Sequence, residues 1–308
     1  MEILREVCKL PHKNKKIFFF IFLSTFIPYI LLLIGTMYAF TSISTDLSMN
    51  AIPLMSMNPA SPDYFKQLFK VQQDGVVFFL IEVVVFLLSS VITVFSMMTT
   101  IYVSTMSYLG RDLKLKDLFM KIKKIWIRPV VTWFYAILMN TGLCMLVLPL
   151  IFLIILSKGS SVFVLTIGII LVLLATCLYM YLNLVSMLSI VTSILEDSYG
   201  LQAIGKGAEL IKGRKLVGFV LNFIWMILIG LNMIVSMMNM MKIQGVALML
   251  LISFCTVIFG TLVTILSMMM YTVFYFDCKH SHGEEVEVEE NTGYTKVSTI
   301  PLVDSALP

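Results

Sequence analysis

Apolar residues form long, nearly uninterrupted runs in this chain, and short polar segments separate them. A transmembrane helix needs about 20 mostly apolar residues to cross about 30 Å of hydrocarbon. Six runs meet this requirement, at residues 17–40, 76–107, 129–156, 162–195, 216–241 and 246–276. Hydrophobic side chains make up 59% of the 308 residues and charged ones only 13%, which excludes a water-soluble fold of this length. The pattern predicts an all-α membrane bundle of six transmembrane helices, arranged as three helical hairpins.

Basic residues indicate the orientation of these helices. Lys and Arg gather in the N-terminal lead-in, in the segments after the second and fourth runs, and directly after the sixth. The opposite side holds only Lys66, Lys70, Lys158 and Lys242. Because cytosolic flanks carry the excess of Lys and Arg, both termini are predicted to be cytosolic. The plasma membrane and an endomembrane such as the endoplasmic reticulum are both open as locations.

Three parts follow from this topology. Residues 1–16 form a basic cytosolic N-terminus, residues 17–276 the six-helix domain, and residues 277–308 a cytosolic tail. The tail contains the acidic run 284–290, a composition typical of disorder, and is a candidate surface for protein partners. On the opposite side, residues 41–75 are predicted to be a loop with a short interfacial helix near residues 64–71.

Small and polar residues recur at helical spacing in the second, fourth and sixth runs. Each run also contains a similar Ser-Met-Met or Ser-Met-Leu tripeptide, which is either an internal repeat or chance in a chain with 23 methionines. Such stripes let membrane helices pack closely and hydrogen-bond to one another. The alternative interpretation is a hydrated path or a ligand site.

Glu82 is the only acidic or basic residue inside any of the six runs. A charged group within a bilayer is costly and usually faces a bundle interior or water. We therefore group it with the stripes as a hypothetical intramembrane binding site, comprising Glu82, Thr93, Ser96, Asn183, Ser186 and Ser267. A proton relay or a cation ligand is one role for Glu82. The alternative is a carboxyl near the interface that snorkels or bonds to a neighbouring helix.

The segment 111–128 alternates apolar residues with lysines at helical spacing. It predicts a basic amphipathic helix on the inner leaflet, in contact with anionic lipids. Cys8 and Cys278 flank membrane-spanning runs on the predicted cytosolic side, where reversible lipidation is a hypothesis based on position.

Residues for catalysis and metal binding are sparse. The three histidines all lie outside the apolar runs, and no hydrolase, metalloprotease or nucleotide-binding motif occurs. We therefore expect no catalytic residue, metal or cofactor. Nucleic acid is not an expected partner either, because no basic surface interleaved with aromatic residues is present.

Several segments resemble a plant-specific family of six-span membrane proteins with no established activity. They are the basic lead-in, Ala208-Glu209-Leu210-Ile211-Lys212-Gly213, Tyr275-Phe276-Asp277-Cys278-Lys279, and the tail from His282-Gly283-Glu284 to Tyr294-Thr295-Lys296-Val297. The arrangement is also similar to the membrane domain attached to some bacterial glycerophosphodiesterases, without their catalytic barrel. The resemblance covers most of the chain and implies the six-span fold.

Together, these features predict a non-enzymatic membrane protein that organises or recruits partners through its cytosolic surfaces. The alternative is a small-solute or proton-coupled transporter or channel. That function would use Glu82 and the polar stripes of the second, fourth and sixth helices.

Overall fold

The computed structural model describes residues 2–57, 61–111, 113, 115–156, 162–242, 246–283, 286–290 and 293–297. Six long helices dominate it: α2 (Lys15–Ser56), α3 (Pro62–Tyr108), α5 (Ile127–Leu156), α6 (Val162–Leu195), α8 (Lys215–Lys242) and α9 (Val246–Ser281). All six are long and apolar enough to cross a membrane. They pair in chain order as α2–α3, α5–α6 and α8–α9. The predicted helical membrane bundle and its three hairpins are confirmed.

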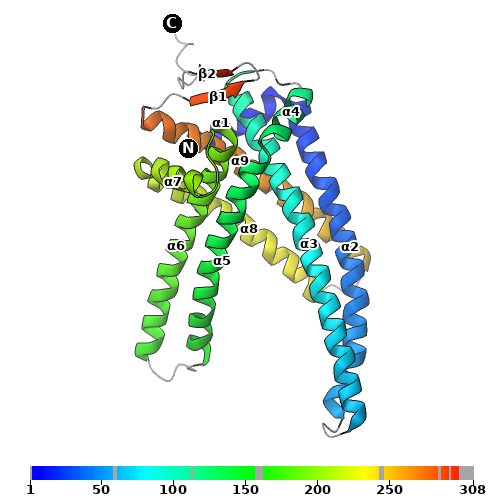
Figure 1. Cartoon of the computed structure of the whole chain (residues 1–308). Coiled ribbons are helices and arrows are strands. Elements are labelled where there is room, and N and C mark those ends of the chain that lie inside the picture. Colours follow the sequence, from blue (N-terminus) through cyan, green and yellow to red (C-terminus); the bar gives the residue numbers. More distant parts are fainter. Residues whose placement is uncertain are drawn as a thin grey trace.

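The hairpins meet at one end of the molecule, and α2–α3 diverges from α5–α6 toward the other end (Figure 1). Three short helices and a 3-10 turn lie where they meet: α1 (Glu2–Lys13), α4 (Leu115–Ile125), α7 (Leu201–Leu210) and η1 (Ile211–Gly213). We call this region the packed end. Both the N-terminal helix and the last turns of α9 belong to it, because α1 contacts α9.

Burial is concentrated at the packed end. The buried residues of α3 begin at Val94 and continue to Ser107, and those of α6, apart from Gly168, fall between Asn183 and Leu195. The other halves of the hairpins expose large apolar side chains, for example Leu146 at 64% and Leu174 at 67%. Lipid rather than protein must cover these side chains, because water would not.

The α2–α3 hairpin is longer than the sequence pattern predicted. α2 has 42 residues and α3 has 47, so they extend about 60 and 70 Å at 1.5 Å per residue. The loop with a short interfacial helix predicted for residues 41–75 is therefore wrong. Pro62 begins α3 at a position that needs no backbone donor, and the Ser61 hydroxyl accepts a hydrogen bond from the Tyr64 amide at 3.2 Å.

Side-chain hydrogen bonds between α2 and α3, which we call polar rungs, fix the register of the two helices. Near the packed end, the Asn14 amide donates to the Ser107 hydroxyl at 2.9 Å. Near the far end, the Asn50 amide donates to the Asp74 carboxylate at 2.8 Å, and the Gln67 amide donates to the Asn50 side-chain oxygen at 3.2 Å. A polar residue in the seam between two helices favours one register over its neighbours.

The tail differs from the predicted disorder. α9 continues to Ser281, and strands β1 (Val286–Glu290) and β2 (Gly293–Val297) form an antiparallel hairpin with Val286 opposite Val297. Alternation of valine with glutamate is a strand pattern, and it outweighed the acidic composition. Residues 298–308, which complete the predicted disordered tail, lie outside the described residues.

Candidate functional site

The polar stripe of α3 is covered by α2. The Thr25 hydroxyl donates to the Ser96 hydroxyl at 3.1 Å, and the hydroxyls of Tyr29 and Thr93 lie 2.6 Å apart. Ser96 is only 2% exposed. These contacts are those expected of closely packed membrane helices, which bury hydroxyls by bonding them to one another.

The stripes of α6 and α9 are likewise occupied by protein. The Ser186 hydroxyl donates to the Leu182 carbonyl at 2.7 Å and accepts from the Asn140 amide of α5 at 3.3 Å. The Ser267 hydroxyl donates to the Thr264 carbonyl at 2.7 Å. Asn183 and Ser267 are both buried within the bundle. The described contacts of this set are therefore with α2, with α5 and with carbonyls of the same helices.

Glu82 lies apart from the other members of the predicted intramembrane site. Its side chain is exposed on α3, in the half of the hairpin away from the packed end. Along the helix it is about 20 Å from Ser96, at 1.5 Å per residue. The structure does not bring Glu82 together with Asn183, Ser186 or Ser267.

The two cysteines predicted as lipidation sites have different environments. Cys8 is exposed on α1, so lipidation there stays a prediction. Cys278 is 0% exposed at the packed end, where its thiol is out of reach of an acyl donor. Burial disfavours lipidation of Cys278, because α9 continues past this residue and packs it into the bundle, and the prediction is left untested.

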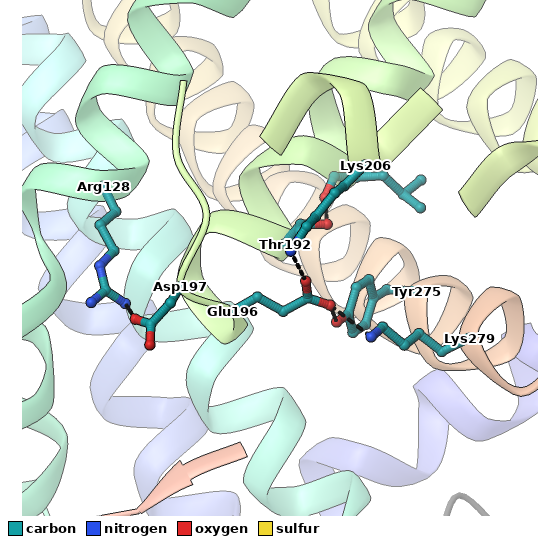
Figure 2. A network of polar contacts seen from close by, with 8 residues as sticks. Arg128, Thr192, Glu196, Asp197, Lys206, Tyr275 and Lys279 are labelled. Atoms are coloured by element: carbon teal, nitrogen blue, oxygen red, sulfur yellow. Dashed lines mark hydrogen bonds and ion pairs between the residues drawn. The ribbon is translucent and has the colours of Figure 1, made fainter. Parts of the chain in front are cut away.

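A cluster of charged side chains converges on Glu196, directly after α6 (Figure 2). Its Oε1 accepts hydrogen bonds from the Tyr275 hydroxyl at 2.5 Å and from Lys279 Nζ at 2.9 Å, both on α9. Its Oε2 accepts from Lys206 Nζ of α7 at 3.1 Å. We call Glu196, Lys206, Tyr275 and Lys279 the carboxylate clamp, because one carboxylate at the end of α6 binds side chains of both α7 and α9.

The clamp is largely removed from solvent. The side chains of Glu196 and Lys279 are 16% and 12% exposed, whereas that of Lys206 is 52% exposed. Burial raises the pKa of Glu196, but the hydrogen bonds from Tyr275, Lys279 and Lys206 and the charge of Lys279 outweigh it. The pKa of Glu196 therefore lies below its ordinary value of 4.5, and the carboxylate is ionised at neutral pH.

Further contacts tie the surrounding elements to the clamp. Arg128 at the start of α5 forms an ion pair with Asp197, and the Gly200 amide donates to the buried Thr132 hydroxyl at 2.9 Å. Gly200 has a φ of 61°, a left-handed conformation that glycine adopts without strain. It lets the chain leave α6 and begin α7 beside α5.

A cavity of about 570 Å³ opens beside the clamp. Acidic and basic side chains line it, namely Glu196, Glu209, Lys206 and Lys279, together with Leu210 and His282. Its size falls in the range of small-molecule sites. Among the residues that the structure describes, no group of three His, Cys, Asp or Glu side chains could hold a metal ion.

Helix α4, within the predicted lipid-binding segment 111–128, divides its apolar residues between two environments. Leu118, Ile122 and Ile125 are at most 6% exposed and pack into the bundle, although the prediction had assigned them to the inner leaflet. Phe119 and Met120 are 46% and 47% exposed on its outer side. The prediction was therefore wrong for the buried residues, because α4 uses its most apolar stripe to cover the packed end.

Sequence reasoning did not identify the carboxylate clamp. Glu196 stands in a short connection whose partners are separated from it by 79 positions for Tyr275 and 10 for Lys206. The available signal was an acid directly after an apolar run, on the side where basic residues gather.

Six long apolar helices and a polar cluster at the packed end define a multi-pass α-helical membrane protein. Over residues 1–296 the chain matches the family described as "Domain of unknown function (DUF8558)", and it belongs to that family. Comparison with curated proteins and with solved structures gave no match.

Proposed function

We propose that this protein is a non-enzymatic membrane organiser that recruits partners at its packed end, with that end in the cytosol. The orientation rests on the excess of Lys and Arg in the segments at this end. The proposal includes the resemblance of the chain to plant-specific six-span membrane proteins and its similarity to the membrane domain attached to some bacterial glycerophosphodiesterases.

One observation carries the proposal: polar residues inside the bundle are used for packing, and a cluster of ion pairs lies at the packed end. Ser96, Thr93 and Ser186 each contact a polar side chain of another helix. The ion pairs of the carboxylate clamp and the Arg128–Asp197 pair hold the packed end in one arrangement. A partner would therefore meet a fixed, charged surface.

Two parts of the packed end would contact other molecules. On α4, exposed Phe119 and Met120 lie near exposed Lys116 and Lys123, a combination suited to the headgroup region of an anionic inner leaflet. Beyond α9, the β1–β2 hairpin leaves strand edges that a partner segment can pair with. A two-stranded hairpin is marginally stable alone, which favours its use with a partner.

The experiment is proximity labelling in cells with the labelling enzyme fused to the N-terminus. The full chain is compared with a chain ending at Gly283 and with a matched control that lacks only residues 298–308. Loss of specific neighbours in the chain ending at Gly283, but not in the control, supports recruitment through the hairpin. An unchanged set of neighbours would contradict it.

A flux assay in liposomes distinguishes the proposed organising role from a transport function. Solute or proton flux above that of empty liposomes, lost in Glu82→Gln, would replace an organising role by a transporting one. The proposal expects wild type and variant to match empty liposomes.

A further inference from the structure

The cavity beside the carboxylate clamp lies between three helices. Its described lining comprises Glu196 directly after α6, Lys206, Glu209 and Leu210 of α7, Lys279 of α9, and His282 directly after α9. Among these residues, Leu210 is the apolar one. Sites for mostly apolar ligands are lined mainly by hydrophobic and aromatic side chains. The lining of this cavity therefore suits a small charged ligand instead.

Two ammonium groups share one carboxylate in the cavity. Nζ of Lys206 and Nζ of Lys279 lie 3.1 and 2.9 Å from the two oxygens of Glu196, as Figure 2 shows from close by. These three groups therefore carry one more positive charge than negative. An ammonium group has three N–H donors, and Glu196 supplies the one described acceptor of Lys206. We call Lys206 and Lys279 the positive pole of the cavity.

Glu209 provides a negative pole on the same helix. It lies three residues after Lys206, which places the two Cβ atoms about 5–6 Å apart on α7. Lys206 nevertheless pairs with Glu196, and the exposed carboxylate of Glu209 has no ion pair or hydrogen bond with any residue that the structure describes. Glu209 is therefore an acceptor at the cavity that the protein itself leaves available.

His282 adds a second acceptor to the lining. Its Nδ1 lies 2.9 Å from the carbonyl oxygen of Cys278. A carbonyl oxygen only accepts hydrogen bonds, so in the neutral ring the proton is on Nδ1 and Nε2 is left to accept. The cavity thus combines the donors of two lysines with the acceptors of Glu209 and His282.

The balance of charges selects the class of ligand. The two carboxylates and the two ammonium groups of the lining cancel in formal charge. A simple anion at the positive pole would also meet Glu209, and a simple cation at Glu209 would also meet Lys206, so each would face a like charge. A ligand with one group of each sign pairs with both poles and faces no such repulsion.

We propose that this cavity binds a small zwitterion that joins a phosphate to an ammonium group. The phosphate pairs with Lys206 and Lys279, because several N–H donors match its several oxygens, and the ammonium group pairs with Glu209. The ion pairs of the carboxylate clamp hold both lysines in place before the ligand arrives, which lowers the cost of binding. The site adds a ligand to the proposed organiser and does not depend on that role.

Two sources share this chemistry, a free solute and the headgroup of a phospholipid. The headgroup is within reach because Glu196 directly follows α6, which is long and apolar enough to cross a membrane. Titration calorimetry on the full chain in non-ionic detergent tests the free compound phosphoethanolamine against methyl phosphate and ethanolamine. Native mass spectrometry tests phosphatidylethanolamine against phosphatidylglycerol with the same acyl chains.

We expect the zwitterion to bind about tenfold more tightly than its controls in at least one of these two assays, since each control lacks one of the two pairings. Preference for phosphoethanolamine would identify a free solute as sufficient. Preference confined to phosphatidylethanolamine would identify a lipid as the source. The proposal is overturned when neither compound is preferred to its controls.

A matched pair of substitutions locates the site. Glu209→Gln removes the negative pole and should weaken binding of the preferred zwitterion about tenfold, without loss of fold, because Glu209 is exposed and has no described partner. Glu6→Gln removes a carboxylate that pairs with Lys9 on α1, away from the cavity, and should bind as the wild type does.

Reversal of the charge provides a second variant with a gain of binding. Glu209→Lys makes the cavity positive at both ends, so methyl phosphate should now bind more tightly than phosphoethanolamine. Thermal unfolding without ligand verifies that each variant is folded. Equal affinity of wild type and Glu209→Gln for the zwitterion, or an unchanged preference in Glu209→Lys, would refute the site.

Discussion

The packed end and the far half of the α2–α3 hairpin are built from the same kind of helix but are held in different ways. At the packed end, segments of α1, α3, α6, α7 and α9 surround each other, and Phe274 and Tyr275 have no exposed surface. In the far half, each helix has one neighbouring helix, and only the residues that face this neighbour are half-buried. The number of neighbours, rather than helix length, therefore decides where this molecule resists opening.

The two regions also differ in their polar chemistry. The packed end holds buried ions that satisfy each other in the carboxylate clamp. The far half is pinned by the amides of Asn50 and Gln67 and the carboxylate of Asp74, which stay accessible to solvent. A lost partner should therefore cost much more at the packed end than at the far rung.

The largest contrast should come from truncating one phenylalanine in each kind of environment. Phe274→Ala removes a ring with 0% exposure and leaves a cavity, so we expect the free energy of unfolding to fall by about 3 kcal/mol. Phe152→Ala removes a ring that is 61% exposed in the far half of α5, with an expected loss below about 0.5 kcal/mol. Unfolding in nanodiscs measures both. Equal losses would mean that the two regions are equally packed.

The next largest effect should come from the carboxylate clamp. Glu196→Gln leaves the largely buried Lys279 without its counter-charge, and we expect a loss of about 2 kcal/mol at neutral pH. The lowered pKa adds a pH dependence: in the wild type this stability is complete above the ordinary value of 4.5 and is lost as pH falls through the lowered folded value.

Thermal unfolding at a series of pH values checks this prediction for Glu196→Gln, which should lack that acid step. The control is Asp197→Asn, since Asp197 is 50% exposed and its pair with Arg128 should contribute below about 1 kcal/mol. An acid step of equal size in wild type and Glu196→Gln would remove Glu196 as its origin.

Two glycines give a contrast of opposite sign. A Cβ on Gly207 of α7 would lie 2.5 Å from the Ser189 hydroxyl and 3.1 Å from the Val185 carbonyl, so Gly207→Ala should destabilise by about 1 kcal/mol. A Cβ on Gly142 of α5 would meet nothing within 4 Å, so Gly142→Ala should stabilise by about 0.5 kcal/mol through helix propensity. Paired melting curves decide the signs. A stabilising Gly207→Ala would show that α7 and α6 are less closely packed than described.

The smallest effect should be local to the far rung. Asn50→Ala removes the hydrogen bonds to Asp74 and from Gln67, and should raise hydrogen exchange near residues 48–54 and 67–74 by about threefold. The global melting temperature should not move, because this half opens independently of the packed end. Faster exchange in α6 or in the last turns of α9 would show that the two regions are coupled.

The membrane-spanning core was predictable because apolar run length reports it directly. Residues 162–195 were predicted as one run and form α6 with the same bounds, and the run 129–156 differs from α5 by two residues at its start. The extension of α2 and α3 was missed because Pro53, Pro62 and Gly75 are typical of loops. The faces that α2 and α3 pack together contain Asn50, Gln67 and Asp74, so a search for apolar runs could not find this part of the hairpin.

The candidate site was less accessible to sequence reasoning. Thr93, Ser96, Asn183, Ser186 and Ser267 were placed correctly within helices, but spacing along one helix does not say which neighbour meets it. Glu196 illustrates the same limit, because the hydrogen bonds and ion pairs of its carboxylate come from Lys206, Tyr275 and Lys279, which lie on two other helices. Such convergence is a property of the tertiary fold.

The carboxylate clamp can be completed only late in synthesis of the protein. Glu196 leaves the ribosome well before Tyr275 and Lys279, so its carboxylate has no α9 partner while the last hairpin is still being synthesised. Until the sixth helix is inserted, Glu196 therefore has Lys206 of α7 as a partner but lacks the two donors that α9 supplies. A chain truncated before Tyr275 would therefore lack the contacts that tie the end of α6 to the last turns of α9, whichever of its other helices have formed.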